Sequence, residues 1–364
     1  MHYYLDCNEL NAGVLSVIKA LPLRSTMPIL DGIYMEATNN GVRLMCSDLM
    51  MQKECFLPST VDQEGRCVVP AKMFAEVLRK MPESIIEISL QANVLVMQSG
   101  KTRNQVQCID FDEFPTMKFS GDSIDVKLHK NACKNMINQT AFAVAQDDSK
   151  PMLTGVYMEM ADNKITMVAT DSYQFAMNTM YVDNNLSQKS TIIPGKTIQE
   201  IARMMDEAQE TVILSFSNTH VKVDLGGTAL VARLLDGNYI DYKRIIPKES
   251  KTRVLINRKE LFNSIERAQL VAREGNNNIL MRFEDNMLYI SAESFIGKLN
   301  DELEVQLVGD NITISFNPKY CLNILKNIAD DKVYFEFNNN INPCVVRPVQ
   351  GESYYFLIVP MRIY

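Results

Sequence analysis

The stretch VPAKMF at residues 69–74 decides the fold, because it recurs as IPGK at 193–196 and as NPKY at 317–320. Pro70, Pro194 and Pro318 follow one another at intervals of 124 residues, and each precedes an apolar run typical of a strand. A repeat at a fixed period sets the architecture before any local interpretation. A repeating unit of this length is a whole domain. The sequence therefore predicts three tandem copies of one domain, at residues 1–120, 121–245 and 246–364.

Each copy contains two stretches with the 3.6-residue apolar spacing of an amphipathic helix. Proline, which opens the second of them, is favoured in the first turn of a helix. Short runs rich in β-branched residues, such as 29–36 and 152–159, predict strands. Two helices packed against antiparallel sheet make each copy an α+β domain. The helices are expected at 9–21, 71–81, 130–145, 196–208, 258–274 and 318–330.

The composition is that of an ordinary globular protein, with 364 residues, 46% hydrophobic and 22% charged. Neither a long apolar run nor a signal-peptide pattern is found, so we expect a cytoplasmic protein. The eight cysteines are scattered without a C-x-x-C spacing. They are expected to be buried thiols, and neither a metal nor a cofactor is expected.

The net charge of −7 argues against nucleic-acid binding when the chain is taken as a whole. Over the six expected helices, however, Lys and Arg exceed Asp and Glu by five, which leaves a charge of −12 for the rest of the chain. Basic helices on an acidic protein can be solvated faces and nothing more. In a repeated domain they can also form one surface that meets phosphates without reading sequence.

Six motifs spread over the whole chain resemble the bacterial β sliding clamp family, the processivity subunit of DNA polymerase III. They are RSTMPIL at 24–30, VPAK at 69–72, FP at 114–115, ATD at 169–171, LDGNYIDY at 235–242 and VPMRI at 359–363. The resemblance implies a head-to-tail homodimer that closes into a ring of six domains around duplex DNA. It also implies that the chain is not itself an enzyme, because a clamp makes and breaks no bond.

The resemblance implies a DNA-facing set on the helices and on one loop. Well-known members carry aromatic residues in that loop, where this chain has proline and methionine. The matching positions are Arg24, Lys72, Arg79, Asp147, Lys150, Pro151, Met152, Lys196, Asn317 and Tyr320.

The resemblance further implies an apolar pocket between the second and third domains that takes short hydrophobic peptides. Its partners would be the replicative polymerase catalytic subunit, clamp loader subunits, other polymerases, ligase and mismatch-repair proteins. Residues 172–174 read Ser-Tyr-Gln where familiar members have glycine, histidine and arginine, so the peptide preference is expected to differ. The matching positions are Leu153, Thr170, Ser172, Tyr173, Gln174, Phe175, Ile240, Arg244, Ile245, Pro343, Leu357, Ile358, Val359, Pro360, Met361 and Arg362.

The ring seam is expected between basic positions of the first domain and acidic ones of the third, around an apolar centre. Asn104 replaces a hydrophobic family position. The matching residues are Lys101, Arg103, Asn104 and Val106, facing Leu270, Val271, Asp301, Glu302 and Glu304.

Two alternatives remain open from the sequence. One is a diverged clamp-like paralogue that binds peptides without serving replication. The other is an enzyme that uses Asp48 and Asp171, which recur at equivalent strand ends. Their recurrence favours a structural role in a turn.

Overall fold

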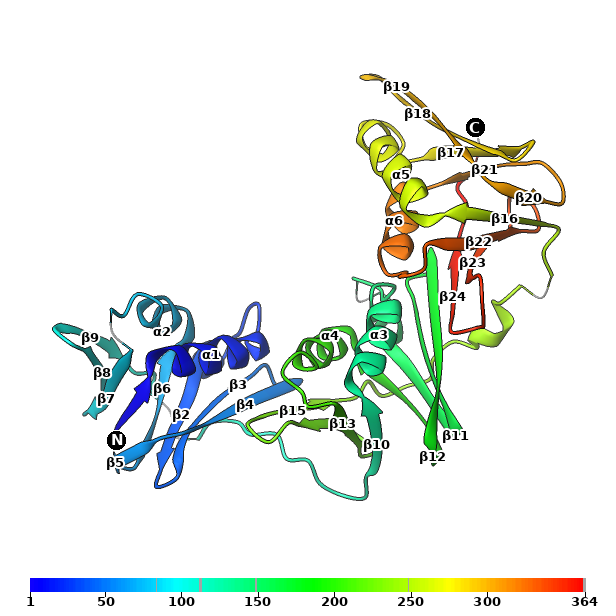
Figure 1. The fold of residues 1–364 in the computed structure, drawn as a ribbon. Coiled ribbons are helices and arrows are strands. Elements are labelled where there is room, and N and C mark those ends of the chain that lie inside the picture. Colours follow the sequence, from blue (N-terminus) through cyan, green and yellow to red (C-terminus); the bar gives the residue numbers. More distant parts are fainter. Residues whose placement is uncertain (83, 111–112, 148, 248, 363–364) are drawn as a thin grey trace. The chain divides into compact units, whose positions relative to one another are not determined.

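The computed structural model describes residues 1–364 except 83, 111–112, 148, 248 and 363–364, and except the side chains of 184–185 (Figure 1). Two compact units emerge. Unit 1 consists of Met1–Lys130 and Arg203–Leu234, and unit 2 of Asn131–Ala202 and Leu235–Tyr364. The second repeat is thus divided between them, because its strands complete sheets begun by the first and third repeats. The exact domain boundaries stay a prediction.

Unit 1 contains two antiparallel sheets. The five-stranded sheet has the order β5-β1-β7-β8-β9, and the eight-stranded sheet has the order β10-β13-β14-β15-β4-β3-β2-β6. The strands are β1 (His2–Asp6), β2 (Gly32–Thr38), β3 (Gly41–Ser47), β4 (Met51–Pro58), β5 (Thr60–Gln63), β6 (Gly65–Pro70), β7 (Ile85–Gln91), β8 (Val94–Ser99), β9 (Thr102–Gln107), β10 (Ile124–His129), β13 (Thr211–Phe216), β14 (His220–Asp224) and β15 (Thr228–Arg233).

Unit 2 repeats the plan with a seven-stranded sheet, β11-β12-β24-β23-β22-β16-β20, and a four-stranded sheet, β19-β18-β17-β21. The strands are β11 (Gly155–Thr170), β12 (Gln174–Pro194), β16 (Thr252–Asn257), β17 (Ile279–Glu284), β18 (Met287–Ser294), β19 (Gly297–Glu304), β20 (Gln306–Val308), β21 (Ile312–Phe316), β22 (Lys332–Phe337), β23 (Cys344–Pro348) and β24 (Tyr354–Ile358).

All six expected helices are present, each ending two to four residues earlier than predicted. Local chemistry explains where they begin: the Asp6 carboxylate accepts the N–H groups of Asn8 and Glu9, and Asn257 caps Lys259 and Glu260 in the same way. The helices are α1 (Cys7–Val17), α2 (Ala71–Leu78), α3 (Lys130–Ala141), α4 (Gly195–Met204), α5 (Arg258–Ala272) and α6 (Pro318–Lys326). Single 3-10 turns add η1 (Ile18–Ala20), η2 (Pro28–Asp31), η3 (Pro151–Thr154) and η4 (Tyr242–Arg244).

The predicted strands at 29–36 and 152–159 were wrong at their first residues. A 3-10 turn, η2 or η3, precedes each strand, because a proline opens the turn and backbone hydrogen bonds close it. Gly32 and Gly155 then begin the strands. A Cβ on Gly155 would lie 2.6 Å from Ile192 Cγ2, so glycine is required where the strand crosses its partner so closely.

Sheets continue from one repeat into the next at two equivalent junctions. In unit 1, β4 pairs with β15, with Glu54 opposite Ala229. In unit 2, β12 pairs with β24, with Met177 opposite Tyr355. Each junction therefore merges strands of successive repeats into one sheet, and it leaves one strand of each outer repeat, β9 and β19, at the end of its sheet.

The segment that connects one repeat to the next packs an aromatic side chain on a tyrosine of the preceding repeat, and the tyrosine holds the equivalent position in both cases. Phe114 lies on Tyr34, with ring centroids 5.3 Å apart. Tyr239 stacks on Tyr157, the counterpart of Tyr34, at 5.1 Å. Both connecting segments are thus held against the sheets by aromatic contacts, which stabilise beyond the area they bury.

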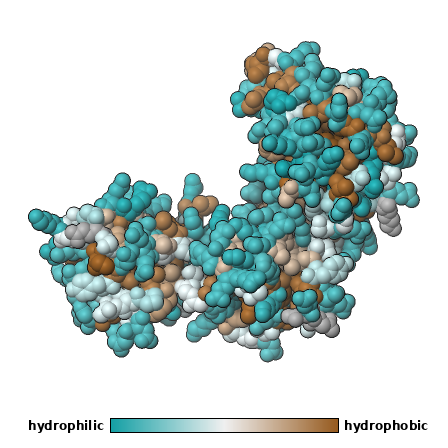
Figure 2. Space-filling model, in the orientation of Figure 1, coloured by the Kyte–Doolittle hydropathy of each residue, from teal (hydrophilic) through white to brown (hydrophobic). Residues whose placement is uncertain are grey.

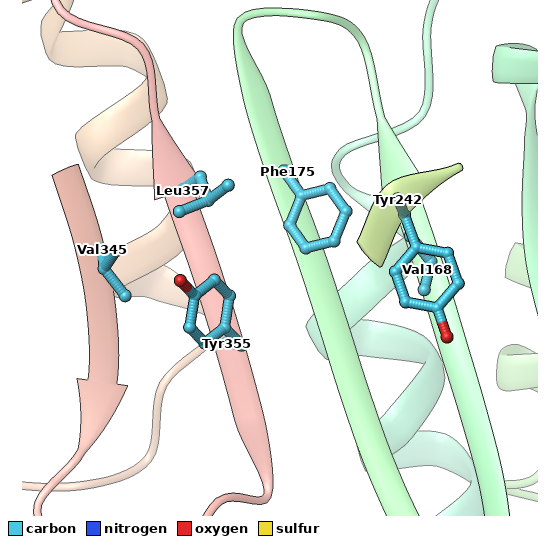
Figure 3. Close-up of a cluster of buried hydrophobic side chains, with 6 residues drawn as sticks. All are labelled: Val168, Phe175, Tyr242, Val345, Tyr355 and Leu357. Atoms are coloured by element: carbon cyan, nitrogen blue, oxygen red, sulfur yellow. The ribbon is translucent and has the colours of Figure 1, made fainter. Parts of the chain in front are cut away.

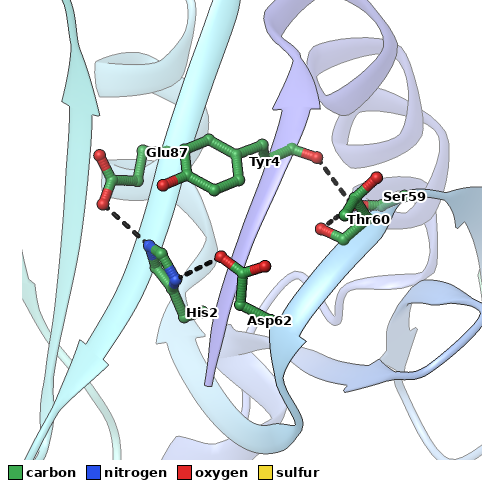
Figure 4. A network of polar contacts seen from close by, with 6 residues as sticks. All are labelled: His2, Tyr4, Ser59, Thr60, Asp62 and Glu87. Atoms are coloured by element: carbon green, nitrogen blue, oxygen red, sulfur yellow. Dashed lines mark hydrogen bonds and ion pairs between the residues drawn. The ribbon is translucent and has the colours of Figure 1, made fainter.

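A polar cluster ties the N-terminal strand to both neighbours (Figure 4). The His2 ring lies between two carboxylates, with Nδ1 3.0 Å from Asp62 on β5 and Nε2 2.8 Å from Glu87 on β7. Ser59 Oγ donates to the Tyr4 carbonyl at 2.7 Å. These contacts fix the register of β1, and with it the start of α1.

All eight cysteines are free and buried, as the scattered spacing predicted. Burial raises the pKa of the Cys133 and Cys321 thiols to about 12, which keeps both protonated and unreactive at neutral pH. Within the described part of the chain, no helix is both long and apolar enough to cross a membrane.

Candidate interaction surfaces

Much of the predicted peptide pocket maps onto one sheet face of unit 2, beside a buried apolar cluster (Figure 3). Strand alternation puts Phe175 of β12 and both Tyr355 and Leu357 of β24 on this face. Segment 236–246 contributes Tyr242 to the cluster and packs Tyr239 and Ile246 against it. The cluster consists of Val168, Phe175, Tyr242, Val345, Tyr355 and Leu357.

Segment 236–246 is fastened to β11. The Tyr242 hydroxyl donates to Glu159 at 2.7 Å, and Lys243 Nζ lies 3.4 Å from the same carboxylate. Burial, followed by the Glu159 hydrogen bond, raises the pKa of Tyr242, so the phenol stays a donor. The segment therefore acts as a fixed wall beside the cluster.

Four apolar side chains that lie within three residues of a cluster member in the sequence remain exposed, although they are large enough to be core residues. They are Tyr173, Ile240, Ile245 and Val359, each with more than a third of its surface accessible. We call these four the apolar patch. Polar residues cover most of the face that Figure 2 shows, and an exposed apolar group that borders a buried cluster is typical of a docking surface.

Two backbone hydrogen bonds position the C-terminal segment beside the patch. Val359 N donates to the Tyr173 carbonyl at 2.9 Å, and Met361 N donates to the Ser315 carbonyl at 2.7 Å. Pro360, which lies between the two donors, and Met361 are half-buried, whereas Arg362 is exposed. Only the backbone of this segment is held by these bonds, so the Met361 side chain keeps the adaptability of an unbranched thioether.

The loop that carries Tyr173 is held rigidly. Asp171 Oδ1 accepts from Tyr173 N at 2.8 Å and from Gln174 N at 2.9 Å. Ser172 has a left-handed φ of 81°, and its hydroxyl accepts from Lys150 Nζ at 3.0 Å. Asp48 caps the matching turn of the first repeat in the same way. Both aspartates have the predicted turn role.

Two predicted pocket residues lie on the opposite face of the sheet. Gln174 and Ile358 are buried toward the helices, because strand alternation turns them away from Phe175 and Leu357. The Gln174 side chain donates to the Asp171 carboxylate at 3.1 Å and accepts from Asn323 at 3.4 Å. Gln174 therefore stabilises the loop from behind and does not form part of the patch.

The remaining pocket positions lie around the cluster in different environments. Leu153 and Thr170 are buried, and Pro343 is half-buried. Arg244 is exposed and paired with Asp241 at 2.8 Å, so its charge is already partly balanced. The sequence prediction missed Tyr242 and Tyr355, the largest members of the cluster. The alternation of β24 and the LDGNYIDY motif were the signals that could have found them.

Three of the positions predicted to face DNA make other contacts in the structure. Asn317 caps α6, its Oδ1 accepting from Lys319 N at 3.0 Å. Tyr320 stacks on Tyr173, with centroids 5.8 Å apart and planes 8° from parallel, which places it beside the apolar patch. Met152 packs its sulfur against Gly237. These contacts favour structural or docking roles for the three residues.

The basic positions keep the exposure that phosphate contact needs. Arg24, Lys72, Arg79 and Lys196 are all exposed, Lys72 on α2, Arg79 just after it and Lys196 on α4. Helices α3 and α6 each carry two lysines and no acid. The helices as the structure bounds them therefore keep the positive charge that the sequence indicated.

Loop 145–152 is less available to DNA. Asp147 accepts hydrogen bonds from Ser149, which lower the pKa of its carboxyl and keep it negative. Lys150 is engaged by Ser172, and Pro151 is exposed at the start of η3. Asp148 lies outside the described residues, as does Ile363 of the C-terminal motif.

The expected seam residues lie on or beside β9 in unit 1, and on β19 and α5 in unit 2; β9 and β19 each end a sheet. On β9 and the turn before it, Lys101 and Arg103 are exposed and Val106 is buried. Asn104 is half-buried, with its amide 3.9 Å from the Met81 sulfur. An unpaired strand edge of this kind is a template for pairing with another strand.

The acidic side of the seam is only partly free. Asp301 is buried enough for desolvation to raise its pKa, but hydrogen bonds from Arg267 and Ser264 outweigh this and lower the pKa overall. Leu270 is 56% exposed on α5, and Val271 is half-buried. Glu302 and Glu304 are exposed. The charges left for a partner are therefore Glu302 and Glu304, beside an exposed leucine.

Comparison with known proteins gives full-length similarity. The domain families described as DNA polymerase III beta subunit, N-terminal, central and C-terminal domain match residues 1–118, 127–241 and 243–362. The beta sliding clamp of Bacillus subtilis (strain 168) is 33% identical, with all of both chains covered. That of Staphylococcus epidermidis (strain ATCC 12228 / FDA PCI 1200) is 32% identical, covering 98% of this chain and 97% of the relative.

Solved structures also show similarity over the whole chain. The crystal structure of the Bacillus subtilis DNA polymerase sliding clamp has a TM-score of 0.94 at 32% identity, and both chains are covered in full. The DNA polymerase III beta subunit of Thermotoga maritima has a TM-score of 0.93 at 27% identity, also over both whole chains.

Proposed function

The chain belongs to the DNA polymerase III beta subunit family, the beta sliding clamps, and from this premise we propose how its surfaces divide the work of a clamp. The protein is a DNA sliding clamp, a ring-shaped homodimer that encircles duplex DNA. The observation that carries this function is similarity over the whole chain to proteins that are clamps. No observation favours the diverged paralogue.

We propose that the chain itself catalyses nothing and works in the cytoplasm as a processivity factor. Asp48 and Asp171, the candidates for an enzymatic site, use their carboxylates on turn N–H groups. The basic helices would hold duplex DNA by its phosphates, without sequence preference. Retention by a closed ring lets each phosphate contact be weak, so that the clamp can slide.

We propose that Lys72 and Arg79 contribute to this phosphate contact. Replacing both with alanine should lower the slope of log K against log salt for a linear duplex by about two, since each lost contact releases about one counterion fewer. Fluorescence anisotropy over a salt series measures the slope. Replacing Lys127 and Lys222, which lie on strands β10 and β14, is the matched control and should leave the slope unchanged. An equal reduction of the slope in both double variants would contradict the assignment of Lys72 and Arg79 to phosphate contact.

We infer the register of the ring seam from the strand pairing at the two internal junctions. Ser47, Thr170 and Glu293 hold equivalent places in the three repeats, because each pairs across its hairpin with the residue five positions later. Glu54, Met177 and Asn300 follow these three residues at the same distance along the chain, so they are equivalent as well. Glu54 faces Ala229 across the first junction, and Ala229 corresponds to Arg103 in the hairpin of the first repeat. We infer that Arg103 of one copy lies opposite Asn300 of the other.

A disulfide test checks this register. The double variant R103C/N300C should oxidise to a covalent dimer on a non-reducing gel, because directly opposite positions have Cβ atoms about 4.5–5.5 Å apart. The shifted pair R103C/E302C is the control and should cross-link far less. The eight native cysteines are buried and give little background. Equal cross-linking by both pairs, or by neither, would refute the register.

The apolar patch is the proposed docking surface for partner proteins. Exposed apolar side chains beside a preformed cluster suit a short hydrophobic peptide. Tyr320, stacked on Tyr173, belongs with this surface, so we propose that it serves docking rather than DNA. The partners proposed are the replicative polymerase, the clamp loader and other replication and repair proteins.

A further inference from the structure

A second concave site borders the same buried cluster. It is a cavity of about 400 Å³ in unit 2, between strands β11 and β12 and the hairpin β23–β24. Met177, Ile246 and Tyr355 line it, and the same three residues belong to the cluster or pack against it. The cavity is therefore continuous, through shared side chains, with the surface under the apolar patch.

The cavity walls are basic on an otherwise acidic protein. Lys164 of β11 lines it and has no ion-pair partner among the described residues. Arg347 lines the opposite side, with its guanidinium carbon 4.7 Å from the centre of the Tyr355 ring. Glu352 is the one acid among the described lining residues. We call this site the basic cavity.

The charge of Arg347 is only partly neutralised. Its Nε lies 3.1 Å from Glu336, a carboxylate that is 4% exposed. Arg253 binds the same carboxylate with Nε at 2.8 Å, so two guanidinium groups share one negative charge. A positive balance therefore remains beside the cavity, where partial burial strengthens its attraction for an anion. Thr179 and Tyr181 of β12 add hydroxyl groups to the cavity lining.

We propose that the basic cavity binds an acidic side chain that flanks the hydrophobic peptide docked on the apolar patch. This rests on the proposed docking function. Lys164 and Arg347 would meet the carboxylate, while Met177 and Ile246 would contact the methylene groups that carry it. Continuity with the docking surface favours a residue of the same peptide over a free anion. The cavity then makes the clamp prefer partners whose docking segment is followed or preceded by Asp or Glu.

Peptide binding tests the proposal. The probes are a labelled Gln-Leu-Ser-Leu-Phe core peptide and the same core with two glutamates, or two serines, spaced by Gly-Ser-Gly at either end. In low salt, the glutamates at one end should tighten binding by about 5- to 10-fold relative to the serines. K164E should abolish this gain and leave affinity for the core peptide unchanged. K332E, a charge reversal outside the cavity in the same unit, should keep the gain.

Each outcome decides something different. If the core peptide does not bind, the docking function itself is wrong. If the core binds but the glutamates give no gain, or K164E keeps the gain, the basic cavity does not recognise the flank. If a Gly-Ser-Gly-Glu-Glu peptide without the core binds as tightly as the linked peptide, the cavity is a free-anion site, and the proposal is overturned.

Discussion

Replacing Ile240 and Val359 together with aspartate is expected to weaken binding of a Gln-Leu-x-Leu-Phe peptide by more than about 100-fold. The two side chains are 38% and 37% exposed, and a docked peptide would complete their burial. Full burial of an aliphatic side chain of this size stabilises by about 1.5–3 kcal/mol, so burying the exposed third of each is worth roughly 0.5–1 kcal/mol. The two losses multiply in the dissociation constant, and each new carboxylate would also have to be desolvated. Stimulation of the replicative polymerase should fall with the peptide affinity.

Folding should survive this change, because both side chains already face solvent. The matched control replaces Ile213 and Val308 with aspartate, two exposed apolar residues outside the apolar patch. Isothermal titration with the peptide compares the two double variants. Should the patch variant bind as tightly as the unchanged protein, the docking surface has been placed on the wrong residues.

Replacing Leu270 with lysine is expected to raise the dissociation constant of the dimer by about 30- to 1,000-fold, the effect of losing an interface anchor. Leu270 is 56% exposed in the single chain, so lysine costs the isolated fold little. At the seam it would replace the apolar centre with a cation that faces Lys101 and Arg103 of the other copy. Sedimentation over a dilution series measures the dissociation constant.

Val308, which is 71% exposed and lies on β20, in a different sheet from the seam strands β9 and β19, supplies the control V308K. V308K should remain a dimer at concentrations where L270K is a monomer. Dissociation of both variants at the same concentration would point to a general charge effect. Dissociation of neither would remove Leu270 from the seam.

The repeat was visible in the sequence because Pro70, Pro194 and Pro318 mark a helix start that backbone chemistry dictates locally. The same holds for the six helices, whose caps and apolar spacing are local features. The strand starts were misplaced at Gly32 and Gly155, because the preceding 3-10 turns depend on backbone bonds that an apolar run does not reveal.

The candidate sites were predictable as regions and less so as side chains. Tyr173 and Phe175 lie on the side of the proposed docking surface, whereas Gln174 between them faces the helices, since strand alternation separates neighbours. Asn317 and Tyr320 look alike as polar residues of one helix. Only the fold shows that the first is a cap and the second a stacking partner of Tyr173, contributed by another repeat.

The division of labour among the copies also depends on the fold. The two internal junctions are equivalent in strand pairing, yet the exposed apolar patch lies beside the second, where segment 236–246 and the C-terminal segment meet. At the first junction, the polar Gln52 holds the place of Phe175, although Met50, in the place of Tyr173, is also exposed, at 42%. The repeats therefore share strand pairing and basic helices, whereas docking is proposed for one junction.

Retention on circular DNA tests the central claim, that the chain holds DNA by encircling it. Clamps loaded onto a nicked circular plasmid are isolated by gel filtration in high salt, and half of the sample is then cut once with a restriction enzyme. A closed ring should stay on the circle and run off the linear form, because salt weakens phosphate contacts but cannot open a topological link. Equal retention on circular and linear DNA would contradict the clamp.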